Sequence, residues 1–299
     1  MSLSDEARQI SAGISYMPFG VDELDSHHKG IPTGSSVMLA GAPDAGTAAF
    51  TYTSLARLML AKHDPDHVPN RLSDRKEHIP ENVTYVTLSN DREHVYSELE
   101  EVLDDAQFET LTEHLTVVDY SQRYIDLLPV PPALFDERRA TDDIEAPGGD
   151  ASPDDRPDDN TFRTLLNDVS ERLTEARDNI IVVDSFSDFR RATSFGLASG
   201  RTIAFLAGLR EAAANWGNLV YVTYDRRAGQ VRSDASIQGL SHGSIYFYSN
   251  DKGFKTYRTM RVGSFGGALD SEQQVTFDSR IGDHGFTAKA TKKIRSSDF

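Results

Sequence analysis

The chain has 299 residues, with 31 Lys and Arg against 47 Asp and Glu, and therefore carries a formal net charge of −16 at pH 7. Because cysteine is absent, disulfide bonds, thiolate metal sites and a cysteine nucleophile are all excluded. The sequence holds neither an apolar run of membrane-spanning length nor a signal-peptide core, so we expect a soluble, cytoplasmic protein with no membrane partner.

The acidity has an unusual make-up, since Asp outnumbers Glu by 31 to 16 and Arg outnumbers Lys by 23 to 8. An excess of short carboxylates keeps a protein hydrated in concentrated salt, where the Debye length falls to about 3 Å at 1 M and screens self-repulsion. The composition therefore predicts a salt-adapted protein. The same negative charge disfavours binding along a nucleic-acid backbone.

Most of the chain predicts apolar strands that alternate with helices. We expect strands over 36–40, 83–88, 115–120, 180–184 and 219–224, and helices over 47–62, 93–105, 161–177 and 200–215. This alternation indicates a mostly parallel sheet covered by helices on both faces. From residue 244 the pattern changes to period two, which predicts antiparallel strands over 244–249, 254–262, 274–281 and 286–294, with hairpin turns at 250–253 and 282–285.

Several segments lie outside this pattern. An N-terminal tail covers 1–17, and 62–80 is a polar connection rich in Pro, His and Asp. Residues 136–160 hold ten acidic and three basic residues, a net charge of −7, and almost nothing apolar, so we expect a disordered acidic insertion within a domain over 18–285. The end of the chain, 286–299, is a basic strand and tail with Lys289, Lys292, Lys293 and Arg295.

The first predicted strand leads into a glycine-bounded turn, Gly41-Ala-Pro-Asp44-Ala-Gly46, that opens a helix. This is the frame of a phosphate-binding loop, in which backbone N–H groups surround the phosphate oxygens. A working loop continues with a lysine that neutralises the phosphates and a hydroxyl that binds magnesium. Here these two positions are Thr47 and Ala48.

The surrounding segments resemble the KaiC-like branch of the RecA-type ATPases. Phe19-Gly-Val-Asp-Glu-Leu-Asp25 and Gly30-Ile-Pro-Thr-Gly-Ser35 are similar to the opening motifs of that family, and Ile180–Asp184 is similar to its Walker B strand. Thr256-Tyr-Arg-Thr-Met-Arg261 resembles its K-M-R-G element. The resemblance spans about residues 18–285 and, with the acidic composition, suggests a halophilic archaeal source.

The resemblance also implies which functional groups are missing. In the family, the second strand ends in two glutamates that polarise the attacking water, whereas here Leu88 runs into Ser89-Asn90 with no carboxylate before Asp91. The lysine of K-M-R-G is Thr259, although Arg261 remains. Together with Thr47 and Ala48, these changes predict decay of the ATPase activity.

Asp184 keeps the Walker B carboxylate, and two interpretations are open. It could hold a metal–nucleotide complex, or it could have a structural role and bond the turn that follows the strand, at Ser185 and Ser187. We favour the structural role, because Ala48 has no hydroxyl that could act as a second ligand to the metal.

Other chemistry-bearing residues fit ordinary structural roles. The pairs His27-His28 and His63/His67 are expected to be solvated loop histidines, since no carboxylate is organised around them. The aromatic residues of the C-terminal strands fit sheet core and cross-strand pairs better than base stacking: Tyr246, Phe247, Tyr248, Phe254 and Tyr257.

We therefore predict an α/β RecA-like P-loop fold, a mostly parallel sheet flanked by helices with C-terminal antiparallel strands, that is not an active enzyme. The leading hypothesis is a regulatory or scaffolding module that contacts a protein partner, either an active homologue or another copy of itself. The first alternative binds ATP or ADP, with weakened magnesium binding and little hydrolysis, through Gly41, Asp44, Gly46, Thr47, Ala48, Asp184 and Arg261. The second is a recombination-type DNA-binding paralogue, supported only by the basic tail and Arg226-Arg227.

Overall fold

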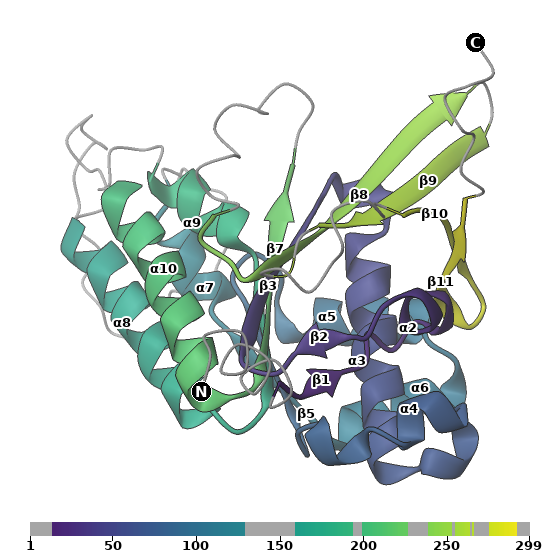
Figure 1. Cartoon of the computed structure of the whole chain (residues 1–299). Coiled ribbons are helices and arrows are strands. Elements are labelled where there is room, and N and C mark those ends of the chain that lie inside the picture. Colours follow the sequence, from purple (N-terminus) through teal and green to yellow (C-terminus); the bar gives the residue numbers. More distant parts are fainter. Residues whose placement is uncertain are drawn as a thin grey trace, which may run out of the picture.

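The structure is a computed structural model that describes residues 14–128, 159–193, 199–226, 239–252, 255–263, 265 and 275–291. Within these residues a nine-stranded sheet has the order β11-β10-β9-β8-β3-β7-β6-β4-β5 (Figure 1). Its strands are β3 (Ser35–Gly41), β4 (Val83–Thr87), β5 (Leu115–Asp119), β6 (Ile180–Asp184), β7 (Leu219–Asp225), β8 (Gly243–Lys252), β9 (Lys255–Val262), β10 (Thr276–Gly282) and β11 (Gly285–Ala290). A separate antiparallel pair joins β1 (Tyr16–Met17) to β2 (Ile31–Pro32).

The sheet is parallel from β8 to β5 and antiparallel from β8 to β11. The hairpin turn predicted at 282–285 is confirmed, because Asp283 and His284 join the paired ends of β10 and β11. β8 also pairs with β9, but Asn250, Asp251 and Lys252, which we assigned to the turn, lie in β8, and residues 253 and 254 lie outside the described residues. The fold class predicted from the sequence is therefore confirmed. β11 belongs to the same sheet as the strands before it, so the strand that we expected in 286–299 is part of the domain and not of a separate tail.

Helices cover both faces of the sheet (Figure 1). One face carries α2 (Asp22–His27), α3 (Thr47–His63), α4 (Asn70–Ser73), α5 (Arg92–Val102) and α6 (Asp105–Glu113). The other carries α7 (Ser121–Ile125), α8 (Asp159–Glu175), α9 (Phe186–Thr193) and α10 (Ser199–Trp216). Because side chains alternate along a strand, Val37 and Leu39 of β3 pack in the core on the α3 face, whereas Met38 and Ala40 pack in the core on the α8–α10 face.

Two local features differ from the prediction. The helix expected over 93–105 corresponds to α5 but ends earlier, at Val102. A second helix that we did not predict, α6, follows it, because the Asp104 carboxylate accepts a hydrogen bond from the Gln107 backbone N–H at 3.0 Å and caps a new helix. Helix α9 was not predicted, although the sequence contains its capping box. The side chains of Ser185 and Asp188 each accept a hydrogen bond from the other residue's backbone N–H at 3.3 Å.

The polar connection over 62–80 is more ordered than we expected. It holds the end of α3, the short helix α4 and the one-turn helices η2 (Pro65–His67) and η3 (Lys76–His78), and it buries Leu72 and Ile79 in the core. Residues 1–13, 136–158 and 292–299 lie outside the described residues, while Asp159 and Asn160, which we assigned to the acidic insertion, begin α8. No helix among the described residues is long and apolar enough to span a membrane.

Candidate functional site: the glycine loop and the carboxyl edge of the sheet

The glycine loop has the predicted strand–loop–helix arrangement. β3 ends at Gly41, the one-turn helix η1 (Pro43–Ala45) follows, and Gly46 precedes α3 in the left-handed region with a φ of 94°. Gly46, the residue that precedes α3, has no side chain that could cap the first turn of the helix.

The side chains of the loop do not supply the expected chemistry. The Thr47 hydroxyl is buried, has no hydrogen-bond partner in the described part of the chain, and is turned back toward β3: a Cβ on Gly41 would lie 2.6 Å from Thr47 Oγ1. Gly41 is thus required because Thr47 occupies the space beside it. Ala48 and Asp44 are exposed at the mouth of the loop.

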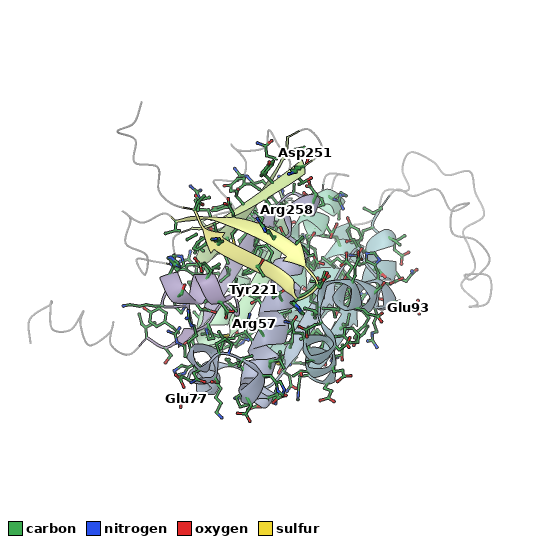
Figure 2. The ribbon with its side chains drawn as sticks, turned by 90° about the vertical axis from the view of Figure 1, so that its right-hand side faces the viewer. Arg57, Glu77, Glu93, Tyr221, Asp251 and Arg258 are labelled. Atoms are coloured by element: carbon green, nitrogen blue, oxygen red, sulfur yellow. The ribbon has the colours of Figure 1, made fainter. Side chains whose placement is uncertain are left out.

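The β10–β11 hairpin closes the loop from one side. A Cβ on Gly46 would lie 3.4 Å from Phe286 Cε2 and 3.5 Å from Ile281 Cδ1, so apolar side chains lie directly against the glycine. The Phe286 backbone N–H donates to the Thr53 hydroxyl of α3 at 2.8 Å, which fastens the hairpin to the helix. Figure 2 views the molecule from this side, with the hairpin facing the reader.

An arginine that the sequence did not single out contacts the loop. Arg258 of β9 donates from Nε to the Asp44 carbonyl at 2.7 Å (Figure 2). Arg261, which the family resemblance favoured, lies on the other face of the sheet, with its guanidinium 5.3 Å from the centre of the Tyr246 ring. The register explains this, because Phe247 and Met260 pair on the α3 face and their neighbours Tyr246 and Arg261 face the opposite way.

Asp184 is held at the carboxyl edge of the sheet by the two neighbouring strands. Its Oδ2 accepts a hydrogen bond from the Tyr85 hydroxyl of β4 at 2.7 Å, and its Oδ1 accepts one from the Thr223 hydroxyl of β7 at 2.5 Å. Burial raises the pKa of Asp184, and the hydrogen bonds from Thr223 and Tyr85 oppose that shift. Both carboxylate oxygens therefore already have partners within the protein.

The polar contacts extend from Asp184 to the side of α3. The Tyr52 hydroxyl donates to Glu98 Oε2 of α5 at 2.5 Å, and the Tyr52 and Tyr85 ring centres are 6.1 Å apart. Burial raises the pKa of both tyrosines, so both stay protonated and act as donors. Period-two alternation places Tyr85 on the α3 face of β4, so the sequence alone indicates the face of the sheet on which this residue lies.

The turn after β6 is not bonded by the Asp184 side chain, contrary to the structural role that we favoured. The Asp188 side chain bonds this turn instead, since its carboxylate accepts a hydrogen bond from the Ser185 hydroxyl at 2.7 Å. The Ser187 hydroxyl instead accepts from the Asp225 backbone N–H at 2.7 Å. The Asp184 side chain bonds the neighbouring strands β4 and β7 instead.

The end of β4 shows why no carboxylate reaches the loop there. The Thr87 hydroxyl donates to the Asn90 carbonyl at 2.7 Å and shapes the turn after the strand. Asp91, the first carboxylate beyond it, caps α5 by accepting from the His94 backbone N–H at 2.8 Å.

The remaining sequence candidates are separate from this site. His63 of α3 stacks on His114 with ring centres 3.5 Å apart, and His67 pairs with Asp64 at 2.7 Å. His28 packs edge-on against Phe277. The described ranges contain no group of three His, Asp or Glu side chains that could hold a metal ion.

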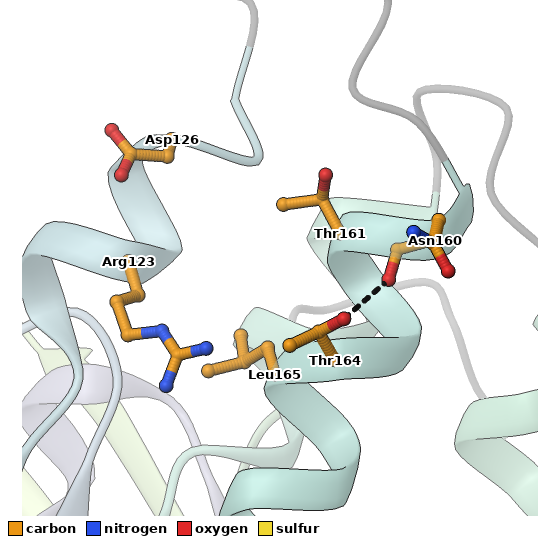
Figure 3. Close-up of a pocket in the computed structure, with 6 residues that line it drawn as sticks. All are labelled: Arg123, Asp126, Asn160, Thr161, Thr164 and Leu165. Carbon is orange, nitrogen blue, oxygen red and sulfur yellow. Dashed lines mark hydrogen bonds between the residues drawn. The ribbon is translucent and has the colours of Figure 1, made fainter. Parts of the chain in front are cut away.

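A cavity of about 220 Å³ lies between α7 and α8, on the other face of the sheet from the glycine loop. Its wall is formed by Arg123, Asp126, Asn160, Thr161, Thr164 and Leu165 (Figure 3). Thr164 donates to the Asn160 carbonyl at 2.9 Å and Arg123 pairs with Asp168, so helix and ion-pair bonds already use these polar groups.

The strand order, with the glycine loop after β3 and Asp184 at the end of β6, defines a RecA-type α/β fold. The comparison with solved structures agrees: the chain is similar to a KaiC-like protein from the hyperthermophilic archaeon Pyrococcus horikoshii, with a TM-score of 0.56 and 13% identity over 92% of this chain and 99% of that one. This likeness shows the fold. No family model matches the sequence, and no curated protein is similar to it.

Proposed function

We propose that this chain is a catalytically degenerate KaiC-like RecA-fold protein that acts as a regulatory or scaffolding module through contacts with other proteins. The observation that carries the proposal is the state of Asp184, whose two carboxylate oxygens are bonded by Tyr85 and Thr223. In an active site, this carboxylate would have to turn toward a metal–water shell instead.

The glycine loop supports the same proposal. A hydrogen bond to a charged group contributes about 1.5–3 kcal/mol, so the absence of a lysine at Thr47 weakens phosphate binding by roughly 10- to 150-fold. Hydrolysis suffers more than binding, because negative charge develops at the transferred group in the transition state. Ala48 offers no hydroxyl to a magnesium ion, and Phe286 and Ile281 lie against Gly46.

A protein that keeps the RecA-type fold but lacks the side chains for ATP hydrolysis still has the outer surfaces through which it can contact other proteins. The partner that we propose is an active RecA-fold homologue or a second copy of the chain, bound through the faces that such folds use for assembly. The composition supports action in concentrated salt, and activity assays therefore belong in molar potassium chloride.

A second candidate function is nucleotide binding without efficient hydrolysis. Arg258 favours it, because its contact with the Asp44 carbonyl brings a guanidinium to the loop that lacks a lysine. The uncapped N–H groups of α3 would then bind a phosphate, and Arg258 would offset part of its charge.

The test is ATP and ADP titration, together with phosphate release, on the full chain in molar potassium chloride. We expect no turnover and no saturable binding below millimolar nucleotide, and we expect Thr47→Lys with Ala48→Thr to strengthen binding. Turnover that Asp184→Asn abolishes, and that the exposed control Asp178→Asn leaves intact, would refute the proposal. Saturable wild-type binding that Arg258→Ala removes would instead establish the second candidate.

A further inference from the structure

Two histidine rings stack on each other where α3 and α6 end. His63 is the last residue of α3, and His114 follows α6 directly and precedes β5. The ring centres are 3.5 Å apart and the ring planes are inclined by only 4°. His63 is therefore not the loop histidine that we expected from the sequence, because it belongs to a helix and its ring packs on another ring.

The stack lies beside the start of the pairing between β4 and β5. The His114 carbonyl accepts a hydrogen bond from the Val83 backbone N–H at 2.9 Å, next to the first pair of the two strands, Val83 and Leu115. His63 Nε2 lies 2.8 Å from the Glu81 carbonyl oxygen, and because a carbonyl oxygen only accepts, this nitrogen carries a proton. In the neutral ring of His63, Nδ1 is therefore the nitrogen that takes up a further proton.

The charged groups around the stack favour the addition of one proton. Lys62 of α3 forms an ion pair with Glu81 at 2.9 Å, and the hydrogen bond from Lys62 lowers the pKa of Glu81, so this carboxylate stays ionised while the histidines titrate. Glu113 of α6, next to His114, adds a second negative charge. The surroundings thus hold one positive and two negative charges, and a single imidazolium balances them.

The geometry of the stack disfavours a second proton. Two unit charges on rings whose centres are 3.5 Å apart repel each other, and the rings are too close for a water molecule to lie between them. One imidazolium on a neutral ring is instead attracted, as a cation is to an aromatic face. Burial lowers the pKa of His114 and a charge on His63 lowers it further, whereas Glu113 and Glu81 oppose these two effects.

The strand next to the stack is the one that can open at low cost. β5 is an end strand of the nine-stranded sheet, with β4 as its neighbour, and it lies with α6 in the lower part of Figure 1. Its Val117 is buried, whereas Thr116 and Asp119 are exposed. Elements with few buried contacts open locally at a lower free energy than the core strands do. Separation of the two rings would therefore free the end of α6 and the start of β5 before any other part of the sheet.

We propose that the stack of His63 and His114 is an acid-sensitive latch. With no added proton or with one, the rings stay in contact and hold the end of α6 and the start of β5 against α3. When both rings are protonated they separate, and the first residues of β5 open from β4. The latch lies at the start of parallel strands that end near the glycine loop, at the opposite edge of the sheet, so the inference goes beyond the proposed function and does not depend on it.

The experiment is hydrogen–deuterium exchange of the full chain at about pH 7.5 and about pH 5, on the two sides of the ordinary histidine pKa, at fixed potassium chloride. Rates are corrected for the chemical pH dependence of exchange. We expect the protection of residues 111–118 in the wild type to fall at least about tenfold in acid. The variant His114→Phe keeps an aromatic ring on His63 but cannot be charged, so its protection should change by less than about twofold.

A second measurement reads the protons directly. In the NMR titration of the histidine Cε1–H signals, the pair should take up its two protons at pH values at least about one unit apart. The single histidine that remains in His63→Phe or in His114→Phe should titrate above the lower of these two values, because the repulsion is gone. The matched control is His67→Asn, which removes a histidine that pairs with Asp64 at 2.7 Å beside the same end of α3 and should leave both readouts as in the wild type.

Several results would overturn the inference. One is wild-type protection of residues 111–118 that does not change in acid, and another is His114→Phe losing as much protection as the wild type. Loss of protection in acid that extends equally to the central strands β6 and β7 would mean global unfolding and not a latch. Two histidines that titrate at the same pH would show that the rings do not interact. None of these results depends on nucleotide, so failure of the latch and failure of the proposed function are distinguishable.

Discussion

Asp25 allows the clearest quantitative prediction. The residue is 8% exposed, and its carboxylate accepts a hydrogen bond from the Phe19 backbone N–H at 2.6 Å through Oδ1 and has no partner in the described chain at Oδ2. It fastens the segment that packs on α3, where a Cβ on Gly20 would lie 2.7 Å from the Ser54 carbonyl oxygen. Burial raises the pKa of Asp25 from 3.8 to about 6.

The consequence for stability follows from the sign of this shift. Well below pH 3.8 Asp25 is protonated in both the folded and the unfolded chain, and no penalty applies. As the pH rises to about 6 the unfolded chain releases the proton more readily than the folded one, so stability is lost. With about two pKa units at 1.36 kcal/mol each, the loss is on the order of 3 kcal/mol.

The variant Asp25→Asn keeps an acceptor for the Phe19 N–H and cannot ionise. We expect the free energy of unfolding of Asp25→Asn, relative to wild type, to rise by about 2–3 kcal/mol between pH 4 and pH 7. Urea unfolding of both proteins at fixed salt, followed by the fluorescence of the single tryptophan, Trp216, measures it. Titrations of the other carboxylates cancel in the difference. A difference that stays flat with pH, or that falls, would refute the reasoning.

Two further predictions concern the loop and the edge of the sheet. Tyr85→Phe removes a donor from the half-buried carboxylate of Asp184, so we expect the free energy of unfolding at pH 7 to fall by about 2 kcal/mol. Urea unfolding should show a smaller loss for the control Tyr221→Phe, which bonds only a neutral hydroxyl, and equal losses would contradict the role of the carboxylate. Gly46→Ala should cost about 1–2 kcal/mol because the φ of 94° disfavours any side chain, although its Cβ would meet only ordinary contacts. The helical control Gly208→Ala, with no atom within 4 Å of its new Cβ, should instead stabilise the protein by about 0.5–1 kcal/mol in thermal unfolding, and a loss no larger at Gly46 than at Gly208 would count against the strain.

Local sequence determined much of this protein. The apolar strands, most of the helices between them and the hairpin turn at 282–285 could be predicted, because burial periodicity and turn residues act over a few positions. The sequence also predicted the glycine loop from Gly41 to Gly46 and the replaced side chains at Thr47 and Ala48, because the residues of a loop motif are contiguous in the chain. The sequence also contains the capping box of Ser185 and Asp188 that starts α9.

Only the tertiary structure decided what surrounds the loop and Asp184. The Tyr85 hydroxyl bonds a carboxylate 99 residues away, and Arg258 bonds a carbonyl 214 residues away. Such contacts depend on strand order and register, because a shift of one residue moves a side chain to the other face of the sheet. Arg258 and Arg261 are three residues apart in β9, so their side chains lie on opposite faces of the sheet. Arg258 therefore reaches the loop, whereas Arg261 stacks on Tyr246 on the other face.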